Sequence, residues 1–168
     1  FLNSDDVFYD NNAIRNIVNA MHENPSVGIV FGDYALIDLN NKLLSLGLGG
    51  EGKKYDYKDL LCSNYTIPLP SAFVTEKAID SFGGKLDESL DLASDWELWA
   101  KIGLAYKVLY IPKVIGCGRK FAGELKFTLQ CAMDNPQKRR MVLDYIFSQP
   151  NLSKDIIRIK KKAYSGTY

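Results

Sequence analysis

Apolar residues recur in two different patterns along the first part of the chain. One has the spacing of a helix and is carried by Ile14, Ile17, Val18 and Met21. Asp10 or Asn11 stands in the capping position before it, and Asn24-Pro25 ends it. Residues 27–31 then form a nearly continuous apolar run, which is typical of a strand buried on both faces. Together with Phe1-Leu2, these patterns predict a strand, a helix and a second strand.

A hairpin is predicted next. Gly32-Asp33-Tyr34 interrupts the apolar run, and we expect the strand to resume over residues 35–38. Residues 39–42 have the composition of a turn, and residues 43–48 are again apolar, so the two segments should pair. The glycine-rich residues 49–54 contain little that would order them, and we expect a flexible loop there.

The remaining sequence alternates short helices with extended segments, which indicates an α/β fold. We expect helices over residues 56–61, 75–81 and 94–102, and in a helical tail from Glu124, after Pro136 and after Ser153. Extended segments are expected over residues 68–74, 108–111 and 114–117. Gly83-Gly84 should allow a tight backbone path, and Gly103 should end its helix in the left-handed conformation.

Composition and charge exclude several functions. The 168 residues are 46% hydrophobic and 24% charged, which suits one globular domain. The net charge of +1 supplies no long-range positive field, so we expect no nucleic-acid partner. The cysteines Cys62, Cys117 and Cys131 form no Cys-x-x-Cys pair, so neither a disulfide framework nor a zinc site is expected. The reducing cytoplasm is the compartment that this cysteine usage fits most simply.

The two ends of the chain raise separate expectations. No apolar run reaches the roughly 20 residues that cross a bilayer. Phe1-Leu2 resembles the end of a buried strand, so we expect the chain to be cut from a larger fold. Near the other end, residues 156–162 are basic with interleaved apolar positions. A solvated terminal helix is the simpler explanation of this segment, and peripheral contact with an anionic membrane is the alternative.

Two constellations of acidic residues are candidates for chemistry. Asp5 and Asp6 follow the expected first strand, where adjacent carboxylates suit Mg²⁺ or Mn²⁺, although a solvated turn has the same composition. Asp95 opens an expected helix between aromatic neighbours, where a carboxylate can act as a general base. The alternative there is structural, because Ser94 and Glu97 have the spacing of a capping box.

The basic and histidine side chains are weaker candidates for chemistry than the acidic ones. Arg119 and Lys120 follow the last expected strand and could reach a diphosphate, although paired basic residues at a strand end are commonly just solvated. His22, the single histidine, lies near a helix end, where it more simply meets the helix dipole. A Ser-His catalytic triad is therefore not expected.

The order of these motifs closely resembles the second half of the family-two glycosyltransferases, which have the GT-A fold. The resemblance covers residues 1–123, and we treat residues 124–168 as a helical tail. The motifs that carry it are, in order, Phe1-Leu2-Asn3-Ser4-Asp5-Asp6, Asn24-Pro25, Val27-Gly28-Ile29-Val30-Phe31-Gly32-Asp33-Tyr34, Pro70-Ser71-Ala72-Phe73, Gly83-Gly84-Lys85-Leu86-Asp87-Glu88 and Ser94-Asp95-Trp96-Glu97-Leu98-Trp99.

The resemblance implies a partial GT-A, Rossmann-like mixed sheet with flanking helices, and a role for each motif. Asp6 would be a ligand of Mg²⁺ or Mn²⁺ with Asp5 assisting, and Asp95 would remove the proton from the acceptor hydroxyl. The substrate-binding residues that the resemblance implies are Ser71, Gly83, Gly84, Trp96 and Glu97. Arg119, which follows the last expected strand, is a further candidate for substrate binding. An inverting transfer would follow, from a nucleotide-sugar donor to a glycan or lipid-linked acceptor. Polysaccharide or lipopolysaccharide synthesis at the inner face of the cytoplasmic membrane fits such an activity.

Two other functions stay open at this point. One is a non-catalytic module that binds a sugar or a partner protein, and the other is a metal-dependent phosphate hydrolase that uses Asp5 and Asp6. In relatives the pocket for the donor nucleotide precedes the Asp-Asp motif, and many carry Arg-x-His where this chain has Arg119-Lys120-Phe121. We therefore expect the chain alone to associate with itself and to transfer little sugar.

Overall fold

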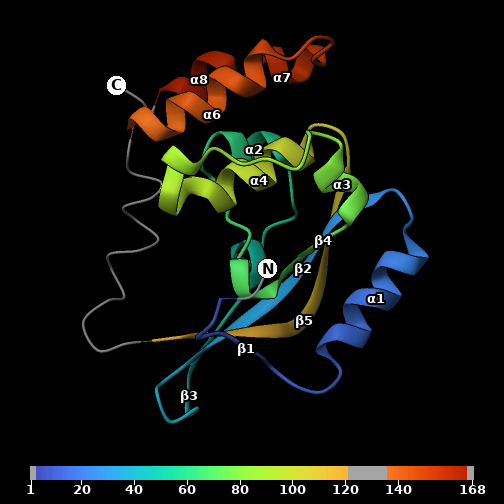
Figure 1. Cartoon of the computed structure of the whole chain (residues 1–168), viewed down its shortest axis with the longest axis vertical. Coiled ribbons are helices and arrows are strands. Elements are labelled where there is room, and N and C mark those ends of the chain that lie inside the picture. The colour runs from blue at the N-terminus through green and yellow to red at the C-terminus, as the bar shows by residue number, and fades with distance from the viewer. Residues whose placement is uncertain (1–2, 121–135, 166–168) are drawn as a thin grey trace.

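The computed structural model describes residues 3–120 and 136–165, which form a sheet with helices on both faces (Figure 1). The strands are β1 (Val7–Phe8), β2 (Val27–Ile37), β3 (Leu43–Gly47), β4 (Ala72–Val74) and β5 (Lys107–Arg119). The α-helices are α1 (Ala13–Glu23), α2 (Tyr57–Leu61), α3 (Glu76–Asp80), α4 (Ser94–Gly103), α6 (Pro136–Ser148), α7 (Lys154–Arg158) and α8 (Lys160–Tyr164). The 3-10 helices are η1 (Gly49–Gly52), η2 (Leu69–Ser71) and η3 (Glu88–Ala93).

The sheet is open and mixed. Its order is β1-β5-β2-β3, and β4 also pairs with β2. The long central strands β2 and β5 are parallel, whereas the other pairs are antiparallel. This arrangement confirms the α/β class and is consistent with part of a Rossmann-like fold. Because β2 and β5 run the same way, their carboxyl ends lie at one edge of the sheet.

Strand β2 separates two apolar clusters. Ile29 and Phe31 are fully buried in the larger cluster, which α2, α4, α6 and α8 cover. Val30, which points to the opposite face, is buried with Ile17 of α1 and Ile115 of β5. The prediction that this segment is buried on both faces is confirmed. Each such side chain contributes roughly 1.5–3 kcal/mol through removal of its surface from water.

The tail helices form an outer layer over α2 and α4 (Figure 1). Val142, Leu143 and Ile146 of α6 and Ala163 of α8 belong to the same buried cluster as Trp99. The helices expected after Pro136 and Ser153 are confirmed. The helix expected from Glu124 and the strand expected at Phe1-Leu2 lie outside the described residues. No helix in the described part of the chain is both long and apolar enough to cross a membrane.

The expected break at Gly32-Asp33-Tyr34 is wrong, because β2 continues through it. Asp33 is 9% exposed, and its Oδ1 accepts hydrogen bonds from the backbone N–H of Gly49 (2.8 Å) and from the Tyr110 hydroxyl (2.7 Å). Its polar side chain is therefore satisfied inside the fold. The hydrogen bond from Gly49 to Asp33 also attaches the glycine-rich segment to β2. This segment was expected to be a flexible loop, but Gly49–Gly52 form a 3-10 helix.

The two strands expected around Pro112 are one strand, β5. Phe31 and Asp33 of β2 face Tyr110 and Val114 of β5, so β5 has extra residues between these pairs. Pro112 lies in this irregularity, where a residue without an N–H interrupts no regular pairing.

Two expected helix ends also differ in the structure. Gly103 is the last residue of α4, but its φ is not positive, so the left-handed stop expected there is wrong. A Cβ on Gly103 would come within 2.5 Å of the Tyr57 ring. Glycine is present at this position because an aromatic ring occupies the space of a side chain. Helix α1 begins after Asn12, whose N–H donates to Asp10 Oδ1 (2.8 Å), so neither Asp10 nor Asn11 is the cap residue.

Candidate functional site

The acidic turn lies at the edge where β2 and β5 end. The backbone N–H of Asp6 donates to the Asn3 carbonyl (3.2 Å) and closes the turn. Arg119, the last residue of β5, donates its backbone N–H to Asp6 Oδ1 (3.4 Å) and its Nε–H to the Asp5 carbonyl (2.9 Å). The structure therefore places Asp5 and Asp6 where ligand groups gather in open α/β sheets.

The guanidinium of Arg119 joins this turn to the β2–β3 hairpin. Its two terminal nitrogens donate to the Asp38 carbonyl (2.8 Å) and to Asn41 Oδ1 (2.8 Å). The sequence left open that Arg119 reaches a diphosphate, whereas in the structure its side chain donates to protein acceptors in two turns. Its positive charge still lies beside the acidic turn, where it can act on an anion through space.

The acidic pair has the donor chemistry of a site for a hard cation. Burial raises the pKa of the Asp6 carboxyl, and the charge of Asp5 raises it further, whereas hydrogen bonds from Arg119 and Asn3 lower it. Carboxylate oxygens fit Mg²⁺ or Mn²⁺, which keep several waters. Within residues 3–120 and 136–165, no third His, Cys, Asp or Glu completes a cluster. Water and substrate oxygens would therefore supply the remaining ligands.

Ser71, the last residue of η2, lies against the middle of β2 and is fully buried. Its hydroxyl is 2.8 Å from the Gly32 carbonyl and 3.1 Å from the Pro68 carbonyl, so it supports the backbone of β2 and η2. Gly116 permits this arrangement, because a Cβ there would collide with the Pro70 carbonyl oxygen. The close approach of η2 to β5 therefore depends on a glycine.

We expect Gly116→Ala to lower the free energy of unfolding by about 1–3 kcal/mol, the usual cost of forcing extra atoms into a packed site. The obstacle is a backbone carbonyl, so the new methyl group cannot be accommodated by a rotamer change. Thermal unfolding should show a midpoint roughly 2–10 °C lower. Gly118→Ala is the matched control two residues later, where the nearest atom would be 3.5 Å away. Equal melting temperatures for the two variants would contradict this account.

Asp95 lies in the first turn of α4, as expected, but the capping box is absent. The cap residue is Ala93, with no side-chain hydrogen bond, and Ser94 is already inside the helix. Asp95 is partly buried, and its Oδ1 accepts from the Trp96 N–H (2.6 Å). Burial raises the pKa of the Asp95 carboxyl, and hydrogen bonds from the backbone N–H groups of Trp96 and Asp95 only partly offset this effect. A carboxylate with a raised pKa is a stronger base.

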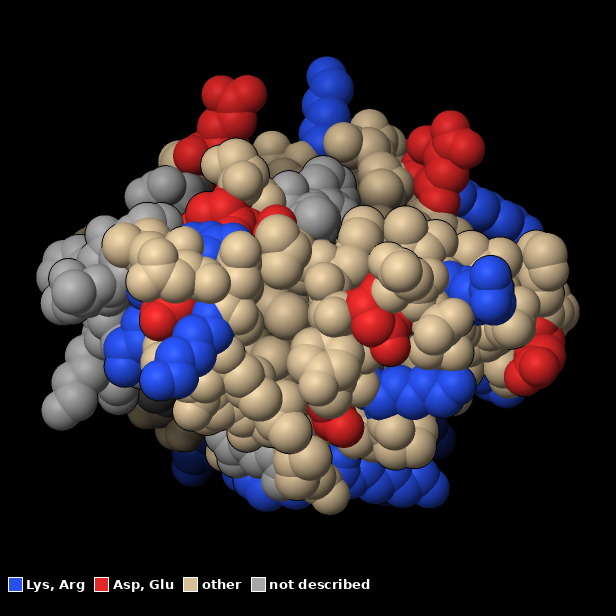
Figure 2. All heavy atoms as spheres, turned by 90° about the horizontal axis from the view of Figure 1, so that it is seen from below, with Lys and Arg blue, Asp and Glu red and all other residues tan. Residues whose placement is uncertain are grey.

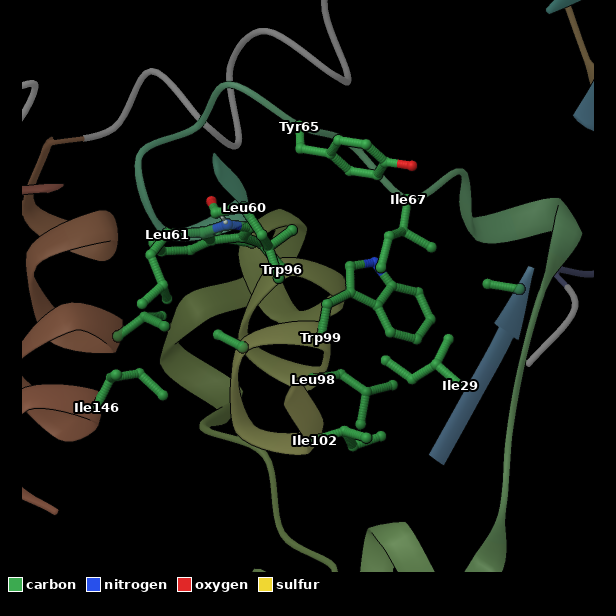
Figure 3. Packing of buried hydrophobic residues seen from close by; sticks show 14 of the residues in the cluster. Ile29, Leu60, Leu61, Tyr65, Ile67, Trp96, Leu98, Trp99, Ile102 and Ile146 are labelled. Atoms are coloured by element: carbon green, nitrogen blue, oxygen red, sulfur yellow. Dashed lines mark hydrogen bonds between the residues drawn. The ribbon is translucent and has the colours of Figure 1, made fainter. Parts of the chain in front are cut away.

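The indoles beside Asp95 belong to the core (Figure 3). Trp96 is 6% exposed, and its Nε1–H donates to the Leu60 carbonyl (3.2 Å). Trp99 lies one turn further along α4 and is 2% exposed. These contacts fix the first turn of the helix against α2, so the backbone that carries Asp95 is held rigidly.

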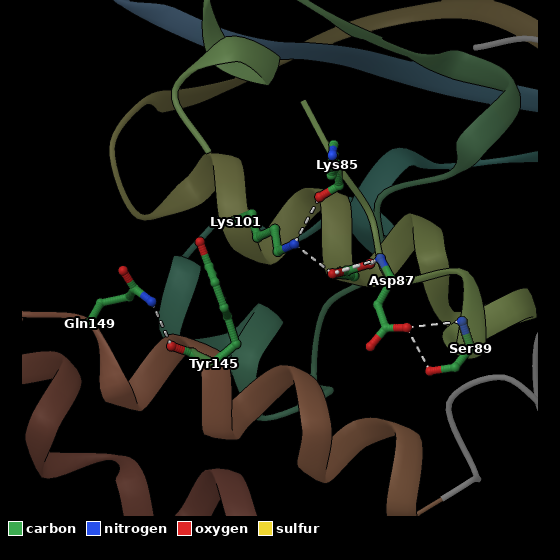
Figure 4. A network of polar contacts seen from close by, with 7 residues as sticks. Lys85, Asp87, Ser89, Lys101, Tyr145 and Gln149 are labelled. Atoms are coloured by element: carbon green, nitrogen blue, oxygen red, sulfur yellow. Dashed lines mark hydrogen bonds and ion pairs between the residues drawn. The ribbon is translucent and has the colours of Figure 1, made fainter. Parts of the chain in front are cut away.

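Glu97 is buried and ion-paired rather than capping the helix. Its carboxylate accepts from the Asp87 N–H (3.0 and 3.3 Å) and lies 2.7 Å from Lys101 Nζ. Lys101 also donates to the Lys85 carbonyl (3.1 Å), and its ammonium lies 4.7 Å from the centre of the Tyr145 ring (Figure 4). The network attaches the segment before η3, and the tail helix α6, to α4.

Gly83 and Gly84 have φ values of 81° and 69°, so both adopt the left-handed conformation that favours glycine. Their N–H groups donate to the carbonyls of Asp80 (3.0 Å) and Ile79 (3.1 Å), which ends α3. The tight backbone path expected here is confirmed. No atom of the described residues lies within 4 Å of a Cβ placed on Gly83, so this side of the turn has room for another molecule.

The structure gathers part of the expected site. Asp5, Asp6 and Arg119 are in direct contact, whereas no hydrogen bond or ion pair in the described part of the chain connects them to Asp95. Sequence reasoning gave Lys101 no role, although its spacing of four residues from Glu97 is that of an ion pair on one helix face.

No protein-family model matches the chain, and no curated protein matches its sequence.

Proposed function

We propose that the chain belongs to an inverting glycosyltransferase that moves a sugar from a nucleotide-sugar donor to a glycan or lipid-linked acceptor. The observation that carries the proposal is the setting of Asp95, a partly buried carboxylate with a raised pKa at the start of a rigid helix. The acidic turn at the carboxyl edge of the parallel strands and the ordered motifs of the sequence support it.

The reaction needs a base on one side of the sugar and charge neutralisation on the other. Asp95 takes the proton of the acceptor hydroxyl while that oxygen attacks the anomeric carbon. The bond from the anomeric carbon to the diphosphate breaks on the opposite face, so configuration inverts and a nucleoside diphosphate leaves. Asp5 and Asp6 would hold Mg²⁺ or Mn²⁺, which supplies Lewis-acid neutralisation of the leaving group.

The experiment is a screen of nucleotide-sugar donors with the longest natural chain that contains these residues and Mn²⁺ or Mg²⁺, read out as released nucleoside diphosphate. We expect Asp6→Asn to lower release by about 100-fold, because a Lewis-acid cation contributes several kcal/mol to such a transition state. Direct titration with Mn²⁺ should show weaker binding by the same variant. Asp80→Asn, a change at an exposed aspartate outside the turn, should alter neither result.

A second function is favoured by a specific observation. Ser71, Trp96 and Glu97, which were expected to line the substrate, are buried and bonded to the protein itself. That arrangement suits a non-catalytic module derived from such an enzyme, with a sugar or a protein as its ligand. Sugar or protein binding with no release of nucleoside diphosphate from any donor, and no effect of Asp6→Asn, would establish this alternative.

A further inference from the structure

Charge is distributed unevenly between the tail and the rest of the chain. Nine of the 21 Lys and Arg residues lie in the tail, residues 124–168, together with four of the 20 acidic residues. The remaining residues therefore carry net negative charge, although the whole chain has a net charge of only +1. The face in Figure 2, across the molecule from the tail helices, shows acidic and basic side chains interspersed around a broad uncharged surface.

Four basic residues of the tail line a hollow of about 710 Å³ on α6, α7 and α8. We call this surface the tail face, and it is lined by Arg140, Asp144, Ile157, Arg158, Lys160, Lys161 and Tyr164. It belongs to the outer layer of the fold, away from the sheet (Figure 1). Asp144, the acidic residue among those described as lining it, accepts from the Tyr164 hydroxyl (2.6 Å) and lies 3.8 Å from Arg140 Nε. Arg158 pairs with Asp155 (3.1 Å), and both ion pairs are exposed, so they leave the excess of positive charge in place. The tail face is thus a cationic surface that fits an anionic partner.

An apolar side chain lies among these cations. Ile157 is 54% exposed, although the described residues of α6 and α8 bury several other apolar side chains. Basic residues around an exposed aliphatic group are the composition of helices that rest in a bilayer interface. A single-stranded nucleic acid would instead use exposed aromatic rings for stacking. Here the Lys160 ammonium lies over the Phe147 ring (5.5 Å) and the Tyr164 ring (6.0 Å).

We propose that the tail face docks on an anionic lipid bilayer, with Arg140, Arg158 and Lys161 at the headgroups and Ile157 inserted between them. The binding requires no nucleotide sugar and no divalent cation, so it stands or falls separately from sugar transfer. It would hold the chain where lipid-linked molecules are presented.

Co-sedimentation with vesicles tests the proposal. The full chain should bind vesicles of 30% phosphatidylserine in phosphatidylcholine, with weak binding to phosphatidylcholine alone and at high salt. A triple Gln variant of Arg140, Arg158 and Lys161 should lose about 100-fold in affinity, from roughly fivefold for each basic residue near an anionic surface. Ile157→Ser should weaken binding several-fold without changing its salt dependence.

The matched control replaces three exposed lysines outside the tail, Lys42, Lys77 and Lys107, with Gln. It has the same net charge as the tail variant and should bind vesicles like the unmodified chain. Equal losses in both triple variants would overturn the proposal, because net charge would then explain the binding. Equal binding to neutral vesicles would also overturn it, as would tighter binding to a single-stranded oligonucleotide than to anionic vesicles. Circular dichroism of each variant establishes that it is folded.

Discussion

Asp95→Asn should lower the rate of sugar transfer by about 10²–10⁴-fold, the usual contribution of a general base. Asparagine keeps the size of the side chain and its contact with the Trp96 N–H, but it cannot accept the acceptor's proton. The measurement is kcat at saturating donor and acceptor. Glu76→Gln is the matched control, because Glu76 is also an acidic residue in the first turn of a helix, α3, and should leave kcat unchanged.

The pH dependence separates loss of a base from loss of structure. Because burial raises the pKa of Asp95, ionisation of this carboxyl opposes folding as pH rises through the unfolded pKa, and the effect is complete above the folded pKa. The Asn variant should therefore be at least as stable at neutral pH. The unmodified chain should gain activity as pH rises through the folded pKa of Asp95. A variant that retains this acidic limb, or unfolds, would contradict the assignment.

Lys101→Met should lower the free energy of unfolding by about 3–5 kcal/mol, because it leaves the Glu97 carboxylate buried without its counter-charge. Methionine preserves most of the apolar stem between the Phe82 and Tyr145 rings, so the change isolates the ammonium. Chemical denaturation, read out as the midpoint and slope, measures the loss.

A second substitution tests the cause. Glu97→Gln in the Lys101→Met background should recover at least about 1 kcal/mol, since a neutral amide can still accept from the Asp87 N–H. Lys85→Met, at an exposed lysine whose carbonyl rather than its side chain accepts the bond from Lys101, should change stability by about 0.5 kcal/mol or less. If the double variant is no more stable than Lys101→Met, the buried charge is not the cause.

Sequence patterns predicted those elements whose determinants are local. The caps Asp56 and Thr75 each accept a backbone N–H at the start of α2 and α3, and both helices appear where expected. The break at residues 32–34 failed because Asp33 is satisfied by groups 16 and 77 residues away. No local pattern shows such partners.

In the candidate site, too, the features that depend on local sequence were predicted and those that depend on distant partners were not. The positive φ values of Gly83 and Gly84 follow from the residue type, and the acidic turn lies at the expected edge. The capping box was wrong because the Glu97 carboxylate forms an ion pair with Lys101, one turn later on the same helix, and accepts a hydrogen bond from the Asp87 N–H. The contacts of Arg119 with the hairpin, 78 and 81 residues earlier, were equally beyond local reasoning.

The contacts of Arg119 also have a thermodynamic consequence. Its side chain donates to the acidic turn through Asp5 and to the hairpin turn through Asp38 and Asn41. Ordering either turn therefore reduces the conformational entropy that remains to be lost by the other. A ligand that immobilises the acidic turn would slow hydrogen exchange in a hairpin that it never touches. By reciprocity, a molecule bound to the hairpin would strengthen binding at Asp5 and Asp6 by the same factor.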